Sequence, residues 1–210
     1  MIEKLLDAIR ARFPMTEKGG AARRFQAAGM AFEARAYDAR GLGHVGVMTA
    51  QGPMRMETLV INPFERDAPI FSYDRIHAMG REILVAEMYD SLLGETFHTE
   101  GMTEALGGQA ACPEGKQTFW YTPLIVPPGL DLKGAAGDAE RFDGIAADFT
   151  QAYLRAACEA EVCDPELKRL RAAAYSEGLL KNGGPATDPV KAAMGEAFTA
   201  DLFRQTLFGA

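Results

Sequence analysis

The sequence predicts an α/β three-layer (α/β/α) sandwich, in which helices flank both faces of a central antiparallel sheet. Residues 30–126 contain short segments rich in Val, Ile, Phe and Tyr, separated by Gly and Pro, a pattern typical of strands joined by turns. Two segments, "MRMETLVIN" (54–62) and "REILVAEMY" (81–89), are almost continuously apolar. Strands of that kind are covered on both faces, so helices are expected above and below the sheet.

Helical patterns lie at both ends of the chain. Apolar residues recur at helical spacing over residues 2–13, and Pro14 ends this pattern. A second pattern follows the Pro-Pro-Gly at 127–129. Asp164-Pro165 and Asp188-Pro189 each combine an N-cap Asp with Pro at the first helical position, which predicts two further helices. The apolar positions are Ile2, Leu5, Leu6, Ile9 and Phe13 in the first helix, Phe142, Ile145, Phe149, Tyr153 and Leu154 in the second, and Val190, Met194, Phe198, Leu202 and Leu207 in the last.

The segments between these elements are expected to be loops within a single domain, residues 1–210. Residues 101–117 are rich in Gly and weakly patterned, which predicts a long loop before the strand "TFWYTPLIV". "KNGGPATD" (181–188) predicts a shorter loop between two helices. The sequence contains no internal repeat, linker or low-complexity tract that would indicate a second domain.

Composition limits the classes of function. No apolar run is long enough to span a bilayer and no secretory signal is recognisable, so a soluble cytoplasmic protein is expected. The net charge of -7 argues against general binding of nucleic acid. The three cysteines form no CxxC pair and do not cluster with the three histidines, so neither a disulfide framework nor a metal site is expected.

Two carboxylates stand out within the predicted strands. If strands 54–61 and 70–76 form a hairpin with Ile61 opposite Ile70, Glu57 lies directly opposite Asp74, with Cβ atoms about 5 Å apart. Two acids so placed on a buried surface should retain a proton near neutral pH, and a retained proton can be delivered to a substrate. Alternatively, one of the acids pairs with Arg55 or Arg75, or lies at an exposed strand end.

Four segments, in one order along the chain, resemble the ferredoxin-dependent bilin reductases. They are "DAPIFSYD" (67–74), "AERF" (139–142), "LLKN" (179–182) and "AMGEAFTADLFRQTLFG" (193–209). The resemblance implies a sheet sandwiched by helices, with a linear tetrapyrrole such as biliverdin held between the sheet and the C-terminal helices. It places Asp74 at the family's catalytic aspartate, Glu57 at a catalytic histidine and Val45, beside His44, at an upstream glutamate. A Glu/Asp pair is similar to the solution of the related red chlorophyll catabolite reductases.

The resemblance also implies an enzyme and its mechanism. Reduced ferredoxin, or flavodoxin, would supply one electron at a time, no cofactor or metal would be bound, and the protein would protonate the resulting radical as a monomer. Asp74 would donate the proton and Glu57 would raise the pKa of Asp74 and help to reprotonate it. His44 is either a third relay group or a structural histidine.

Binding residues follow from the same resemblance. Lys181, Asn182 and Arg171, with Lys168, are candidates for contacts to the substrate and its propionates, although a solvated helix face is the alternative. Pro127 replaces the Arg that precedes Pro at the family's strand end, and Gly183 replaces an acidic residue, so these contacts differ.

Because ferredoxins are acidic, a basic docking surface is expected, formed by Arg23, Arg24, Lys168, Arg169 and Arg171. A tetrapyrrole carrier or sensor without reductase activity, or a plain structural domain, are the competing hypotheses.

Overall fold

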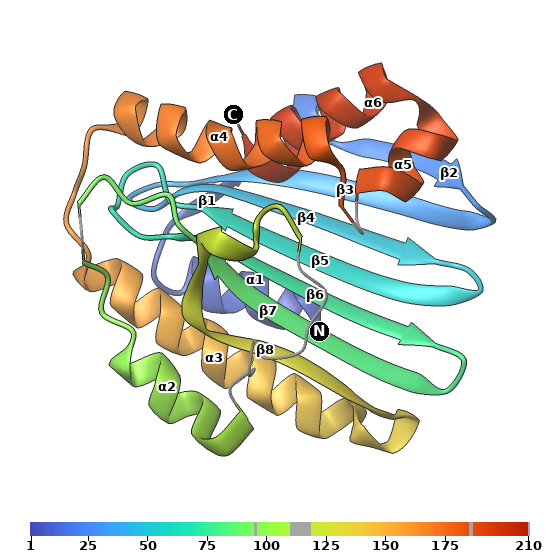
Figure 1. Cartoon of the computed structure of the whole chain (residues 1–210), viewed down its shortest axis with the longest axis horizontal. Helices are drawn as coiled ribbons and strands as arrows, with labels where there is room; N and C mark the ends of the chain where they lie inside the picture. The colour runs from blue at the N-terminus through green and yellow to red at the C-terminus, as the bar shows by residue number, and fades with distance from the viewer. Residues whose placement is uncertain (95, 110–118, 185–186, 210) are drawn as a thin grey trace.

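The computed structural model describes residues 1–94, 96–109, 119–184 and 187–209, and its centre is one antiparallel sheet of eight strands (Figure 1). The strand order is β1-β3-β4-β5-β6-β7-β8, and β2 also pairs with β3. Neighbours in this order pair in antiparallel fashion, most as sequential hairpins. The strands are β1 (Met15–Glu17), β2 (Arg23–Ala27), β3 (Met30–Ala39), β4 (Gly43–Gln51), β5 (Met54–Asn62), β6 (Ile70–Ala78), β7 (Arg81–Tyr89) and β8 (Ile125–Ala135).

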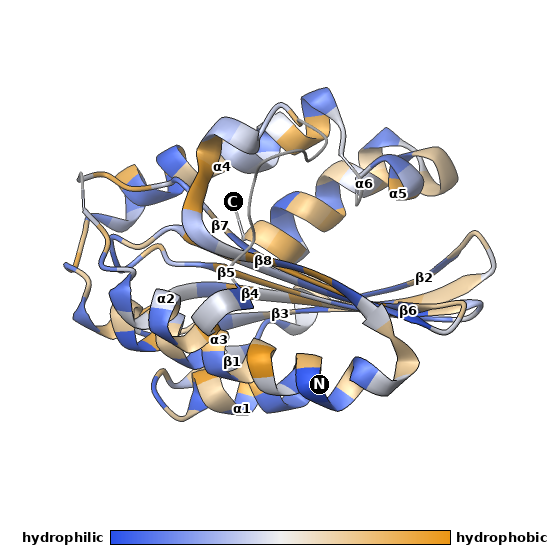
Figure 2. Cartoon of the chain, turned by 60° about the horizontal axis from the view of Figure 1, so that its bottom comes forward, coloured by the Kyte–Doolittle hydropathy of each residue, from blue (hydrophilic) through white to orange (hydrophobic). Residues whose placement is uncertain are grey.

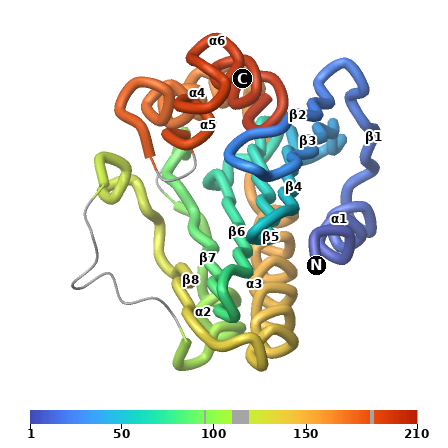
Figure 3. The backbone as a smooth tube through the Cα atoms, turned by 90° about the vertical axis from the view of Figure 1, so that its right-hand side faces the viewer, coloured from blue at the N-terminus to red at the C-terminus, as the bar shows by residue number. Residues whose placement is uncertain are grey.

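Helices cover both faces of the sheet, as the three-layer prediction requires (Figures 2 and 3). One layer consists of α1 (Ile2–Arg10), α2 (Glu100–Leu106) and α3 (Ala139–Glu159), and we call its side the α3 side. The other consists of α4 (Pro165–Asn182), α5 (Thr187–Met194), α6 (Glu196–Asp201) and a π-helical segment (Leu202–Phe208), and we call its side the α4 side. Short 3-10 turns lie at Gly19–Ala21, Gly107–Gln109, Thr122–Leu124 and Ala136–Asp138.

The two sides of the sheet carry two separate apolar cores. Successive side chains of a strand point to opposite faces, so each strand contributes to both cores. In β6, Phe71 and Tyr73 pack against α3, whereas Ile70 packs with the C-terminal helices. Phe71 stacks on Tyr153 of α3 with ring centroids 4.7 Å apart. Helices therefore lie above and below the sheet, as the nearly unbroken apolar runs of β5 and β7 predict.

The C-terminal half differs from the prediction in two elements. The chain after Pro-Pro-Gly stays extended as β8, and a helix begins only at Ala139. Leu130 and Leu132 alternate with polar residues at a spacing of two, and β8 is an edge strand with a register shift near its prolines, where Pro is tolerated. The predicted last helix is interrupted at Gly195, whose φ of +82° favours glycine.

The prediction also differs from the structure at the N-terminus, where two strands were missed, and over the predicted loop of residues 101–117. β1 and β2 are short strands that the sequence analysis did not predict. The helix α2 occupies part of the predicted loop, where Met102 and Leu106, four residues apart, bury their side chains against α3. The remainder of that prediction, residues 110–118, lies outside the described residues.

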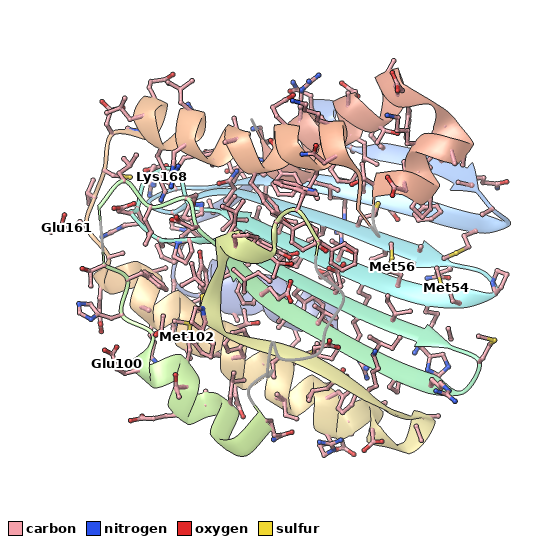
Figure 4. All side chains as sticks on the ribbon, viewed as in Figure 1. Met54, Met56, Glu100, Met102, Glu161 and Lys168 are labelled. Atoms are coloured by element: carbon pink, nitrogen blue, oxygen red, sulfur yellow. The ribbon has the colours of Figure 1, made fainter. Side chains whose placement is uncertain are left out.

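A buried ion pair attaches α4 to the rest of the fold. The Lys168 side chain is 0% exposed, and its Nζ donates to Asp67 Oδ1 at 2.9 Å and to the Ser91 carbonyl at 2.6 Å. Asp67 also accepts the backbone N–H groups of Leu93 and Gly94. These bonds hold α4 to the loops that follow β5 and β7 (Figure 4 labels Lys168). Within the described ranges, no helix is long and apolar enough to cross a membrane.

We predict that Asp67→Ala destabilises the protein by about 3–5 kcal/mol, because it leaves the buried Lys168 charge without its partner. Lys191→Ala, which breaks an exposed pair with Glu196, is the matched control and should cost at most about 1 kcal/mol. Urea unfolding at pH 7 measures both. The double variant Asp67→Ala/Lys168→Met should recover part of the lost stability. Equal losses of stability in Asp67→Ala and Lys191→Ala would contradict the stabilising role of the buried ion pair.

Candidate functional site

Asp74 lies in the middle of β6, on the α4 side of the sheet. The strand register places Thr58 of β5 beside it on one flank and Val85 of β7 on the other, and Asp131 of β8 follows Val85. The Thr58 hydroxyl donates a hydrogen bond of 2.6 Å to Asp74 Oδ1. The carboxyl is therefore held in one orientation by the neighbouring strand.

The sheet around Asp74 is only partly covered on this side. On the α3 side of β5–β7, core residues such as Leu59, Tyr73 and Leu84 are 0% exposed. On the α4 side of β6 and β7, Ile70 and Tyr89 are buried at one end, whereas the side chains in the middle of both strands are half-buried. We call this surface the open face, and it consists of Ser72, Asp74, Ile76, Ile83, Val85 and Glu87.

The open face arises from where the C-terminal helices pack. The π-helical segment lies on β3, β4 and β5, and α5 lies on β2, so this layer is centred over one half of the sheet. Met54 and Met56 of β5 share the α4 side with Thr58 and are also half-buried (Figure 4). Among the described residues, this part of the sheet thus presents a half-buried surface of apolar and polar side chains with the Asp74 carboxyl in its middle.

Aromatic rings border the open face at the end of β7. Tyr89 stacks on Tyr175 of α4 with centroids 4.2 Å apart, and Tyr121 packs edge-on to Tyr89 at 5.7 Å. Trp120 contacts both Tyr121 and Tyr175, and its indole N–H donates to the Gly183 carbonyl at 3.0 Å. The Tyr89 hydroxyl donates to Glu87 Oε2 at 2.7 Å. This cluster connects the last turn of α4 to an acid of the open face.

The surroundings raise the pKa of Asp74 to about 6 from its ordinary value of 3.8. Desolvation is the main cause, and the negative charge of Glu87 adds to it, whereas the hydrogen bond from Thr58 acts in the opposite direction. A carboxyl with such a pKa exchanges its proton near neutral pH and is suited to general acid catalysis.

The predicted Glu57/Asp74 pair is wrong, because the true register differs by one residue. Thr58, not Glu57, is opposite Asp74, and Glu57 is opposite Arg75. Glu57 therefore points to the α3 side, where it accepts a hydrogen bond of 3.2 Å from the amino group of Met1. The alternative pairing of Glu57 with Arg75 is not observed either, since Arg75 pairs with Glu82 and Asp143.

Glu87 is the acid that the sequence analysis missed. Ser72 of β6 is opposite Glu87 of β7, so Glu87 is one diagonal step from Asp74 on the same face. Alternation within "REILVAEMY" could have shown that Ile83, Val85, Glu87 and Tyr89 share one side of β7. The alternation that places Glu87 on this side was therefore present in β7, whereas the sequence analysis looked for the second acid in β5.

His44 has the contacts of a structural histidine, the alternative interpretation, and they do not support a relay role. Its side chain is 2% exposed, and Nε2 donates to the Thr206 carbonyl at 2.8 Å. Burial lowers the pKa of His44 to about 4, so the ring stays neutral near pH 7. Val45 is buried in the core of the α3 side, so its predicted contact with a ligand beside Asp74 is also wrong.

The four residues predicted to contact the substrate or its propionates differ in their exposure and in their partners. Lys168 is buried in its ion pair with Asp67 and presents no charge to a ligand. Arg171 is exposed and pairs with Asp90 at 3.2 Å. Lys181 and Asn182 are exposed at the end of α4, beside the loop residue Gly183 that Trp120 contacts. A substrate contact of Lys181, Asn182 or Arg171 stays a prediction.

The expected basic docking surface is not supported by the contacts of its members. Lys168 is buried, and each of the other four is ion-paired with an acid, which reduces its net positive charge. The pairs are Arg23 with Asp201, Arg24 with Glu33, Arg169 with Glu166 and Arg171 with Asp90. Among the residues that the structure describes, no group of His, Cys, Asp and Glu is arranged to hold a metal ion.

The fold matches that of a known tetrapyrrole protein. Tomato phytochromobilin synthase, whose crystal structure was solved in complex with biliverdin, superposes with a TM-score of 0.71 over 96% of this chain and 79% of that one. The two sequences are 14% identical. No protein-family model and no curated protein matches the sequence. The structural similarity confirms the predicted sandwich fold.

We predict that Asp74→Asn stabilises the protein at pH 7.5 by about 2–3 kcal/mol, but not at pH 4. The folded state keeps the Asp74 proton up to about pH 6, whereas the unfolded chain releases it near 3.8, so ionisation disfavours the folded state as pH rises through this interval. Urea unfolding at both pH values measures the difference. Asp148→Asn, at an exposed position of α3, is the control, and an effect of Asp74→Asn that is equal at both pH values would contradict the raised pKa.

Proposed function

We propose that this protein reduces a linear tetrapyrrole of the biliverdin type, with Asp74 as the proton donor. The observation that carries the proposal is the carboxyl of Asp74, with a pKa of about 6, in the middle of a partly accessible apolar sheet face. The fold supports the substrate class, because phytochromobilin synthase was crystallised with biliverdin. The resemblance of "DAPIFSYD" to the bilin reductases supports the same class.

The open face suits a flat, conjugated ligand. Ile76, Ile83 and Val85 surround Asp74 on it, so an extended ring system would bury apolar surface while its nitrogens or lactam oxygens reach the carboxyl. The tyrosines at the end of β7 offer further stacking surface. Lys181, Asn182 and Arg171 are the candidates for the ligand's propionates.

The chemistry needs electrons from outside and protons from within. Reduction of one double bond consumes two electrons and two protons, and we propose that reduced ferredoxin or flavodoxin delivers the electrons singly, with no bound cofactor. Asp74 protonates the radical formed by each electron transfer, and its raised pKa allows it to hold a proton near pH 6 and to release it to a more basic acceptor. We further propose that the protein acts as a cytoplasmic monomer.

We predict that Asp74→Asn binds biliverdin with nearly parental affinity but reduces it about 10²–10⁴-fold more slowly, because the amide cannot supply the proton. Anaerobic incubation with reduced ferredoxin, followed by chromatography of the pigments, measures the reaction. Glu57→Gln is the matched control on the opposite side of the sheet and should retain the parental rate.

The same experiment separates the proposal from its competitors. A parental protein that forms a coloured complex with biliverdin but never changes it under reduced ferredoxin is a carrier or sensor. A protein that forms no coloured complex with biliverdin is neither a bilin reductase nor a bilin carrier or sensor. Parental turnover by Asp74→Asn would remove Asp74 from the mechanism while leaving reduction itself established.

A further inference from the structure

We propose that Glu87 is the group that reprotonates Asp74 between the two proton transfers, and that Tyr89 positions Glu87 for this task. The inference rests on the proposed function and deepens it, because it assigns the route by which the second proton reaches the site. It is carried by the strand register, by one hydrogen bond and by the packing of the β7 end against α4.

Glu87 and Asp74 share the open face as neighbours on adjacent strands. Ser72 is opposite Glu87 and Val85 is opposite Asp74, so the two acids are diagonal neighbours on adjacent strands. Such positions are about 7–8 Å apart between Cα atoms, a separation within reach of a long side chain such as that of Glu87. A water molecule between two carboxyl groups is a common bridge and can pass a proton.

Tyr89 fixes the orientation of Glu87. Its hydroxyl donates to Glu87 Oε2 at 2.7 Å, and its ring is held by Tyr175 and Tyr121. Burial raises the pKa of Tyr89 well above 10, so the hydroxyl keeps its proton and remains a donor at every physiological pH. One oxygen of Glu87 is thereby occupied, which leaves the other for the open face.

The stoichiometry requires Asp74 to be reprotonated within each cycle. One double bond takes up two electrons from two molecules of a one-electron donor and two protons from the protein, and Asp74 holds one proton at a time. After the first transfer Asp74 is a carboxylate and must recover a proton before the second. Glu87 takes up a proton from solvent and passes it to Asp74 through the bridging water, which returns Glu87 to its carboxylate form, so protons and charge balance over the cycle.

Other polar groups of the α4 side face the pair from each neighbouring element. Thr58 of β5 donates to Asp74, and Asp131 of β8 lies beyond Val85, two strands from Asp74. Tyr121 and Tyr175 lie near Tyr89, and their pKa values are raised by burial. Lys133 is one step from Asp131 on the same side of β8. In the described residues, Glu87 is the acid that combines a diagonal position beside Asp74 with the bond from Tyr89.

Two measurements on Glu87→Gln test the inference. In the ligand-free protein, infrared titration of the Asp74 carboxyl should show a pKa lowered by about 0.5–1 unit, because a negative neighbour is lost. With biliverdin and reduced ferredoxin, kcat at pH 7.5 should fall at least tenfold, its pH profile should shift to lower pH, and the affinity for biliverdin should change less than twofold. Glu57→Gln is the control for loss of a glutamate and should change none of these quantities.

Tyr89→Phe tests the positioning role separately, because it keeps the ring and removes the hydroxyl. We expect kcat to fall about two- to tenfold with KM unchanged, since the bond that orients Glu87 is lost while the bilin surface is kept. A parental kcat in this variant would overturn the role of Tyr89.

The outcomes distinguish this inference from the proposed function. If the parental protein does not reduce biliverdin, the proposed function fails, while the infrared titration still tests the coupling of the two acids. If the parental protein is active and Glu87→Gln keeps the parental pH profile, rate and Asp74 titration, the proposed function stands and Glu87 is not the reprotonating group.

Discussion

The register of β5, β6 and β7 is the constraint on which the site depends. Because side chains alternate between the two faces of a strand, a shift of one residue moves every side chain of that strand to the other face. In the observed register Asp74 shares the α4 side with Thr58 and Glu87, while Arg75 shares the α3 side with Glu57 and Glu82. The same strands thus carry the acids Asp74 and Glu87 on one side and the ion pair of Arg75 with Glu82 on the other.

The C-terminal segment determines which half of the sheet stays accessible. His44 donates to the Thr206 carbonyl and Asn62 donates to the Phe208 carbonyl at 2.9 Å, so the chain end is tied to β4 and β5. Gly46 allows this close approach, since a Cβ there would lie 2.4 Å from the Leu207 carbonyl oxygen. With its end fixed over β4, the helical layer leaves β6 and β7 half-covered, and the open face follows.

The limits of prediction from the sequence have the same physical origin. The existence of β5 and β7 was predictable because both strands are strongly apolar, and the helical spacing of Ile2, Leu5 and Ile9 was sufficient to predict α1. Their apolar character also removes the period-two signal that would fix the register, since neighbours such as Val60 and Ile61 are apolar on both faces. The resemblance to a family motif could therefore identify Asp74, whereas alternation could place Glu87 on one side of β7 but could not fix its register against Asp74.

The two faces of the sheet contribute differently to stability. The core on one face stabilises the fold, which allows the other face to carry acids that destabilise it. On the α3 side, Phe71, Tyr73 and Leu84 are fully buried among Phe142, Phe149 and Tyr153, and this core stabilises the fold without any polar function. On the α4 side, the sheet keeps two carboxyls close together and partly desolvated, an arrangement that disfavours the folded state near neutral pH. A protein selected for stability alone would replace Asp74 by an apolar residue that continues the row of Val85 and Ile83. The proposed function would account for Asp74 at this position, because a bilin that covers the face would take up its proton.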